Sequence, residues 1–180
     1  MIDIGDFMRI ISGKYRGKKL KGFDIEGTRP TMDRVKESIF GMIQGFIPEA
    51  IVLDLFAGSG SLGLEAISNG SKKLILVDNN PIIIKIIKEN ISSFDDDIEV
   101  LNIDYKKYLK NTDSKYDVIF LDPPYRANVL NKAIKIIEDR DLLNDNGIIV
   151  CEYEGIIPEC NYKLIKEKKY GPKAVRIYQK

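Results

Sequence analysis

The fold of this protein is decided by residues 51–63, which read IVLDLFAGSGSLG. The first part, residues 51–56, is an apolar run broken only by Asp54, which is typical of a strand buried on both faces. The glycines that follow allow a tight turn. The helical pattern of 61–69 then begins at Ser61. This stretch therefore predicts a strand, a glycine-rich turn and a helix in direct succession.

The rest of the chain repeats this alternation of strand and helix. Asn80 and Pro81 form an N-cap and first-turn pair that opens another helix. The pattern predicts strands at 51–56, 74–78, 98–103, 116–121 and 148–153, and helices at 61–69, 81–92, 105–110 and 128–138. Apolar strands that alternate with helices predict a mostly parallel, doubly wound α/β sheet, Rossmann-like in type. Such sheets bind ligands at the carboxyl ends of their strands.

Both ends of the chain predict antiparallel hairpins. Near the amino end, a turn at 14–17 separates two short basic strands, and Thr31 is placed to cap a helix. Near the carboxyl end, Gly171-Pro172 separates two more strands, while Asp145–Gly147 is expected to be a turn before the fifth strand. The strands of these hairpins are predicted at 8–13, 17–23, 162–169 and 174–178, and the capped helix at 32–46.

Composition excludes several classes of catalyst. The chain has 180 residues, with no histidine and two cysteines. Without histidine, neither a Ser-His-Asp or Cys-His catalytic unit nor a His-rich zinc or iron site can be built. Two cysteines are too few for a disulfide framework, which indicates a reducing compartment. With no signal-peptide pattern and no membrane-length apolar run, we expect a soluble, cytoplasmic protein.

A near-neutral charge, 28 Lys and Arg against 27 Asp and Glu, hides two basic ends. Residues 8–21 hold six basic residues and no acid, and residues 163–180 hold seven basic residues and one acid, Glu167. The segment between them is acidic. Basic ends on an acidic body predict a polyanionic partner, although lysines that merely decorate exposed hairpins would give the same pattern.

The glycine loop predicts a nucleotide-type ligand. Gly58 to Gly63 match the pattern G-x-G-x-x-G, and Asp78 follows Gly58 by 20 residues, which is also the spacing of a dinucleotide fingerprint. Asp54 opposes a dinucleotide because a carboxylate beside a pyrophosphate is unfavourable. It favours a cationic ligand with an amino group, such as S-adenosylmethionine. Asp78 can accept from ribose hydroxyls in either case, and a purely structural turn is the remaining alternative.

Asp104 follows the third strand and has two interpretations. Its carboxylate is placed to accept from the amino group of an adenine. An aspartate between a strand and a helix is equally well explained as an N-cap.

The segment Asp122-Pro123-Pro124-Tyr125 follows the fourth strand and predicts the chemistry. Two prolines remove two backbone donors, so that an acid is followed by bare carbonyl acceptors. Such acceptors can hold the two N–H bonds of an exocyclic aromatic amine and direct its lone pair at a methyl group. Tyr125 can stack on the base. The alternative is a rigid turn at the end of a strand.

These motifs resemble those of class I S-adenosylmethionine-dependent amino-methyltransferases, and the whole chain from Met8 onward resembles the RsmD family. The match includes the opening 8–17 (MRIISGKYRG), Thr28–Thr31 with Val35-Lys36-Glu37, 55–66 (LFAGSGSLGLEA) and 119–125 (IFLDPPY). The resemblance implies transfer of a methyl group from S-adenosylmethionine to a guanine N2 in small-subunit 16S rRNA, free or in an assembling subunit. Residues 1–7 lie outside the match. Relatives often have Glu where this chain has Asp78.

The resemblance and the motifs together assign residues to roles. Catalysis is assigned to Asp122, Pro123 and Tyr125. Cofactor binding is assigned to Asp54, Phe56, Gly58, Gly60, Asp78, Asn79, Asp104 and Tyr105. RNA contact is assigned to Lys14, Arg16, Lys18, Lys19, Arg29, Thr31 and Arg34, with Lys21 as a further phosphate contact. We expect an extension and basic hairpin over 1–30, a methyltransferase domain over 31–180 that makes effectively one domain with it, no metal, and a monomer.

Three alternatives use related features. An adenine-N6 DNA methyltransferase shares the Asp-Pro-Pro-Tyr chemistry, but the 61 residues between Gly60 and Asp122 leave no room for a target-recognition region. A protein-glutamine methyltransferase also holds an amide nitrogen, but usually has Asn in place of Asp122. A catalytically silent nucleotide- or RNA-binding module is disfavoured by the intact segment at 122–125.

Overall fold

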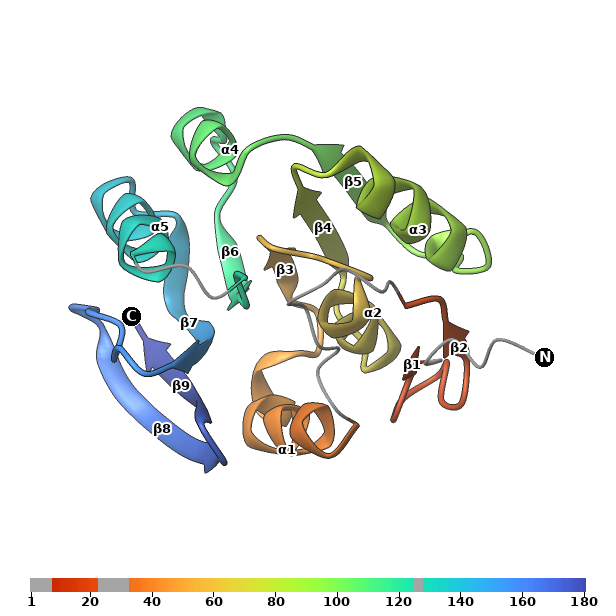
Figure 1. Ribbon diagram of the computed structural model, residues 1–180, viewed down its shortest axis with the longest axis horizontal. Coiled ribbons are helices and arrows are strands. Elements are labelled where there is room, and N and C mark those ends of the chain that lie inside the picture. The colour runs from red at the N-terminus through yellow and green to blue at the C-terminus, as the bar shows by residue number, and fades with distance from the viewer. Residues whose placement is uncertain (1–7, 23–32, 125–127) are drawn as a thin grey trace.

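The computed structural model describes residues 8–22, 33–124 and 128–180, and its centre is a seven-stranded sheet of order β5-β4-β3-β6-β7-β9-β8 (Figure 1). The strands are β3 (Ile51–Asp54), β4 (Lys73–Asp78), β5 (Ile98–Asn102), β6 (Tyr116–Leu121), β7 (Leu143–Glu154), β8 (Lys163–Tyr170) and β9 (Lys173–Gln179). The five strands β3 to β7 are parallel, and β9 is antiparallel to both β7 and β8. The predicted doubly wound α/β fold with its antiparallel C-terminal hairpin is confirmed.

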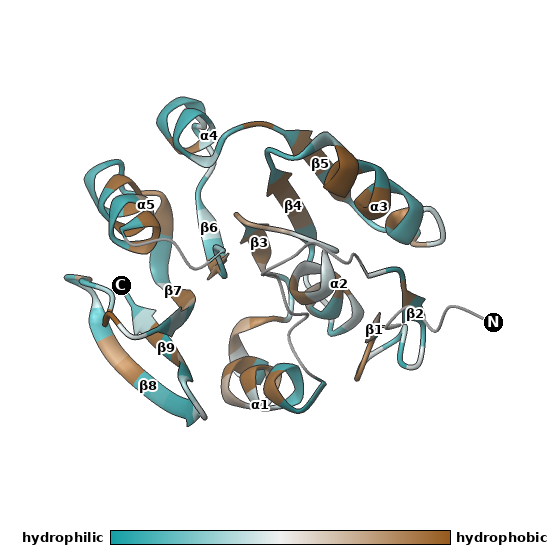
Figure 2. Cartoon of the chain, viewed as in Figure 1, coloured by the Kyte–Doolittle hydropathy of each residue, from teal (hydrophilic) through white to brown (hydrophobic). Residues whose placement is uncertain are grey.

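Helices cover both faces of the sheet. On one face lie α1 (Asp33–Ile43) with the short 3-10 helix Gln44–Phe46, α2 (Ser61–Ser68) and α3 (Pro81–Ile91); on the other lie α4 (Tyr105–Asn111) and α5 (Val129–Asp139) (Figure 1). Side chains of consecutive strand residues pack in the cores on opposite faces of the sheet: Val52 packs on the α1 side and Leu53 on the α5 side. Figure 2 shows β3 and β4 as mostly hydrophobic and α4 as mostly hydrophilic. This burial on both faces explains why the strands are mostly apolar in the sequence.

The N-terminal hairpin is built on strands shorter than predicted. Only β1 (Met8–Arg9) pairs with β2 (Lys19–Leu20), antiparallel. Some of the residues between them bond to a helix: the N–H of Lys14 donates to the carbonyl of Ser68 at the end of α2, at 2.8 Å. Met8, Ile10 and Leu20 belong to the same core as α1 and α2. The paired strands are short because the backbone N–H groups of Ile11, Ser12 and Lys14 donate to α2, while Ile10 still bonds across the hairpin to Gly17 and Lys18.

The turn predicted at Asp145–Gly147 is part of β7, so that prediction was wrong. β7 begins at Leu143, which pairs with Tyr116, and its register with β6 shifts before Ile148 pairs with Val118. Asn146 has a φ of 63° within this irregularity. Because the pairing continues on both sides, the extra residues form a bulge inside one strand and not a loop before it.

Most other predicted elements agree with the structure. Asn80 caps α3 by accepting from the N–H of Ile82 at 2.9 Å, with Pro81 in the first turn. β6 has the predicted bounds. Thr31 lies outside the described residues, so its capping role stays a prediction. Among the residues that the structure describes, no helix is long and apolar enough to cross a membrane.

The strand order places the switch point of the sheet between β3 and β6. The chain leaves β3 toward β4 and β5, then returns to add β6 on the other side of β3. Loops that follow strands on either side of such a point diverge and leave a crevice at the carboxyl edge, where ligands bind in folds of this type. The glycine loop follows β3, and the Asp-Pro-Pro segment follows β6.

Candidate active site

The glycine loop is shaped by backbone conformations and close approach that favour glycine. Gly60 has a φ of 81° and stands at the N-cap of α2. At Gly63, an added Cβ would lie 2.7 Å from Leu74 Cδ1 and 2.8 Å from Leu76 Cδ2, both on β4. The first glycine permits a left-handed turn, and the second lets α2 pack directly against the sheet. The loop therefore holds the N-terminus of α2 at the switch point.

Asp54 lies beneath this loop. Its side chain is 2% exposed, and its Oδ2 accepts from the backbone N–H of Gly63 at 3.0 Å. Burial raises the pKa of the Asp54 carboxyl to about 7, although the Gly63 hydrogen bond opposes the shift. The carboxylate thus braces the first turn of α2, and a nearby positive charge would favour its ionised form.

Asp78, at the end of β4, braces the other side of the loop. Its Oδ2 accepts from Gly58 N–H at 3.2 Å, and its Oδ1 accepts from Asn80 N–H at 2.9 Å. Asp78 is half-buried, and burial raises the pKa of its carboxyl while the hydrogen bonds from Asn80, Gly58 and Asn79 oppose that shift. Two carboxylates therefore lie against one loop, and Asn79 is exposed beside them.

Aromatic side chains border the loop on the α4 side. The rings of Phe56 and Tyr105 pack with centroids 5.1 Å apart. Asp104, just before α4, accepts from the N–H groups of Lys106 and Lys107 through one oxygen, Oδ1, at 3.0 and 3.1 Å. The N-cap interpretation of Asp104 is confirmed. Its contact with an adenine stays a prediction.

The Asp-Pro-Pro segment begins directly after β6. Because β6 pairs with β3, with Phe120 opposite Asp54, Asp122 emerges at the same sheet edge as the glycine loop. Asp122 is half-buried, Pro123 is buried and Pro124 is exposed. Tyr125 lies outside the described residues. The structure thus brings the predicted amine-binding acid and the predicted cofactor loop to adjacent strand ends.

The residues predicted to contact RNA fall into two groups within the described chain. Lys14 forms an ion pair with Asp96, and Lys18 donates to the carbonyl of Ser93 at 2.6 Å and lies over the ring of Phe94. Both hold the hairpin to the loop that follows α3, and Lys21 is paired with Glu89 within α3. The others, Arg16, Lys19 and Arg34, are exposed, and Arg29 and Thr31 lie outside the described residues.

Sequence reasoning missed a buried ion pair that fastens the hairpin. Lys36 of α1 lies 3.3 Å from Glu65 of α2, and it also donates to the Arg9 carbonyl at 2.5 Å. Glu65 accepts from the backbone N–H groups of Ile11 and Ser12 at 2.9 and 2.8 Å. Burial lowers the pKa of Lys36, and Glu65 opposes this. The signal available was one charged residue on the apolar face of each helix.

A second missed residue is Glu152, in the predicted fifth strand. It is 6% exposed and paired with Lys173 of β9 at 2.7 Å. Its signal was an acid inside an otherwise apolar strand. No group of three or more Cys, Asp or Glu side chains is placed to hold a metal in the described parts of the chain.

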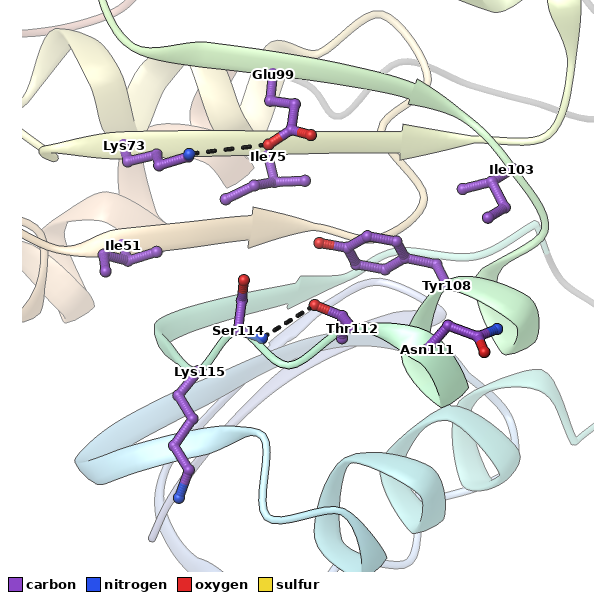
Figure 3. A pocket seen from close by; sticks show the side chains of 10 residues that line it. All are labelled: Ile51, Lys73, Ile75, Glu99, Ile103, Tyr108, Asn111, Thr112, Ser114 and Lys115. Atoms are coloured by element: carbon purple, nitrogen blue, oxygen red, sulfur yellow. Dashed lines mark hydrogen bonds and ion pairs between the residues drawn. The ribbon is translucent and has the colours of Figure 1, made fainter.

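A cavity of about 460 Å³ lies away from these residues, on the α4 face of the sheet (Figure 3). Ile51 and Ile75 line it from β3 and β4, and Tyr108 and Asn111 line it from α4. Lys73 lies 3.8 Å from Glu99 across its wall. None of the predicted site residues within the described ranges lines this cavity.

Comparison with known proteins places the chain among relatives of similar length. The family described as Conserved hypothetical protein 95 matches residues 8–179. Ribosomal RNA small subunit methyltransferase D of Haemophilus influenzae is 38% identical, with 96% of this chain and 93% of the relative covered. The chain belongs to the RsmD family. Ribosomal RNA small subunit methyltransferase D of Escherichia coli K12 is 35% identical, with 96% of this chain and 90% of the relative covered.

The RsmD family assignment agrees with the three-dimensional structure. A solved structure from Escherichia coli, named as a candidate methyltransferase, is similar with a TM-score of 0.87 and 32% sequence identity, covering 96% of this chain and 97% of that one. The family resemblance drawn from the motifs is confirmed over the region where it was expected, from Met8 onward. The basic hairpin is therefore part of the RsmD family region and not an addition to it.

Proposed function

We propose that this protein transfers a methyl group from S-adenosylmethionine to the exocyclic N2 amine of a guanine in small-subunit 16S rRNA. One observation carries the proposal: Asp122 and Pro123 follow β6 directly, and β6 pairs with β3, which leads into the glycine loop. An acceptor cluster suited to an amine and a loop suited to a methyl donor thus share one sheet edge. The names of the relatives, which give ribosomal RNA as their substrate, support the choice of target.

The residues at the loop fit S-adenosylmethionine by their charge. Residues 57–63 contain no basic side chain, and the carboxylates of Asp54 and Asp78 lie against the loop. These acids disfavour a pyrophosphate and favour a cation with a ribose and an α-amino group. When bound, the cofactor supplies a methyl group on a sulfonium, which is a good leaving group. Gly58 and Gly60 would let the backbone approach the cofactor closely, and the rings of Phe56 and Tyr105 would lie beside it.

The Asp-Pro-Pro segment would prepare the amine for attack. Asp122 accepts one N–H bond of the guanine amine, and the Pro123 carbonyl accepts the other. Held in this way, the nitrogen presents its lone pair to the methyl group, and its proton leaves to Asp122 or to water once the N–C bond forms. Tyr125 stacks on the base, which must leave its helix or be offered from a loop. No histidine or metal is needed in this scheme.

The proposal is tested by labelling and by one substitution. Protein and methyl-labelled S-adenosylmethionine are incubated separately with unmodified 16S rRNA, with small subunits and with duplex DNA, and the modified nucleoside is identified. We expect N2-methylguanosine from the rRNA or subunit sample. N6-methyladenine from DNA, or label in protein, would overturn the proposal.

The Asp122→Ala variant should lose methylation while its S-adenosylmethionine dissociation constant stays within several-fold of wild type. Asp139→Ala is the control, because Asp139 is an exposed carboxylate on α5 that pairs with Lys135 four residues earlier. Full turnover by Asp122→Ala would contradict the assignment.

A further inference from the structure

A partly buried ion pair stands beside the Asp-Pro-Pro segment on the neighbouring strands. Glu152 of β7 is 6% exposed, and its Oε1 lies 2.7 Å from Nζ of Lys173 on β9. β6 and β7 are parallel, with Leu121 opposite Cys151. The next residues along the two strands, Asp122 and Glu152, are therefore level at the carboxyl edge of the sheet.

Both acids project toward the α1 face of the sheet. Phe120 and Val150, two residues before them, pack in the core on that face. Because strand side chains alternate with a period of two, Glu152 shares the face of Val150. A residue before proline keeps an extended backbone, so the alternation continues from Phe120 to Asp122. The two residues are thus neighbours, about 4.8 Å apart across the strands.

Lys173, on the next strand β9, lies beside Glu152 on the same face of the sheet. Glu152 is opposite Val175 on β9, and Lys173 lies two residues from Val175, so its side chain shares that face. The strand order β6-β7-β9 therefore arranges a carboxylate, a second carboxylate and an ammonium in sequence along the edge.

The ion pair is more than the sheet requires for cohesion. β7 and β9 already share a ladder of seven register pairs, from Ile148–Gln179 to Glu154–Lys173. A buried ion pair contributes little net stability, because desolvation of the two charges offsets their attraction.

We infer that Glu152 and Lys173 recognise the target base as guanine. The inference rests on the proposed function and explains how that site distinguishes guanine from adenine. The Watson–Crick edge of guanine presents the N2 amine, the N1–H donor and the O6 acceptor in that order. Asp122 holds the amine, Glu152 accepts from N1–H, and Lys173 donates to O6.

The order of groups on the base matches the order of groups on the protein. Lys173 can serve O6 while paired with Glu152, because an ammonium carries three N–H donors. Adenine has an unprotonated N1 and an amine at position 6. The adenine N1 acceptor would face the Glu152 carboxylate, which is also an acceptor. The adenine 6-amine, a donor, would face the Lys173 ammonium, which is also a donor. Polar groups left unpaired in this way reject a wrong ligand.

The test replaces the target guanine by 2-aminopurine, which keeps the 2-amine but has no N1–H and no O6. Small-subunit rRNA with either base at the methylated position is given to wild type and to Glu152→Gln. Wild type should prefer guanine by about tenfold to a hundredfold, the range of one good bidentate base contact. In Glu152→Gln the amide can donate to N1 of 2-aminopurine, so the preference should shrink to within a few-fold or invert.

Controls separate recognition from folding. Glu167→Gln removes a similar ion pair, with Arg176 at 2.8 Å in the β8–β9 hairpin, and should keep the guanine preference of wild type. Should Glu152→Gln not fold, Lys173→Met, at a side chain that is 26% exposed, removes the donor to O6 and should likewise shrink the guanine preference. An unchanged preference in the folded variant overturns the inference and leaves the proposed function standing. Absence of guanine methylation by wild type overturns the proposed function itself.

Discussion

The ammonium of Lys36 lies 3.3 Å from the carboxylate of Glu65, and both side chains are at most 1% exposed. This pair joins α1 to α2, and Glu65 also receives two backbone N–H groups of the N-terminal hairpin. One buried carboxylate thus ties three segments together beside the glycine loop. The hairpin that we propose as an RNA contact is positioned from inside the protein.

We expect Glu65→Gln to reduce the free energy of unfolding by about 3–5 kcal/mol, since it leaves the Lys36 ammonium buried without its partner charge. Urea denaturation measures the change. The control is Glu89→Gln, which breaks the exposed Lys21 pair and should cost at most about 1 kcal/mol. Equal effects of the two substitutions would show that the buried pair has no special role.

Gly63→Ala should destabilise the protein by about 1–3 kcal/mol, because its Cβ would lie under 3 Å from Leu74 and Leu76 in a packed interface. Binding of S-adenosylmethionine should weaken as α2 shifts. Gly41→Ala in α1 is the matched control: nothing lies within 4 Å of its added Cβ, so this exchange should stabilise by about 0.5–1 kcal/mol. Thermal or urea unfolding compares the two, and a stabilised Gly63→Ala would contradict the close packing.

Asp54 predicts a pH dependence of stability with a definite sign. Burial raises the pKa of this carboxyl from 3.8 to about 7, so the folded protein keeps its proton at pH values where the unfolded chain has lost it. The free energy of unfolding should therefore fall as pH rises from about 4 to about 7. Asp54→Asn stays neutral and should gain stability relative to wild type between pH 5 and pH 8.

Urea unfolding of wild type and Asp54→Asn at pH 5 and at pH 8 measures the difference in their free energies of unfolding. The same difference at both pH values would contradict the raised pKa of Asp54. The same variant should bind S-adenosylmethionine more weakly, with the larger loss at pH 8, where the wild-type carboxylate is ionised.

Arg16 and Lys19 are exposed on the hairpin, and we expect Arg16→Ala/Lys19→Ala to weaken RNA binding. The slope of log affinity against log salt should fall by about 1.4, since each phosphate contact to a single strand contributes about 0.7. Filter binding over a range of salt concentrations measures the slope. Lys107→Ala/Lys110→Ala on α4 removes the same charge elsewhere, and an equal loss there would point to non-specific attraction.

Much of the fold could be predicted from the sequence because its signals are local. Gly60, Asn80-Pro81 and the prolines after Asp122 act through backbone angles and nearby hydrogen bonds, so their turns, caps and strand ends were predicted correctly. The errors arose where pairing with a distant strand overrode local signals. The segment Asp145–Gly147, predicted as a turn, is a bulge in β7, because Leu143 before it already pairs with Tyr116 of β6.

The sequence by itself determined the order of elements, the glycine loop and the Asp-Pro-Pro segment, since each depends on residues close together in the chain. Only the tertiary structure decided which charges meet. Lys36 and Glu65, Lys14 and Asp96, and Glu152 and Lys173 are joined by strand order and helix packing. Periodicity shows which face a side chain takes, but the neighbour across that face depends on long-range packing that no local pattern contains.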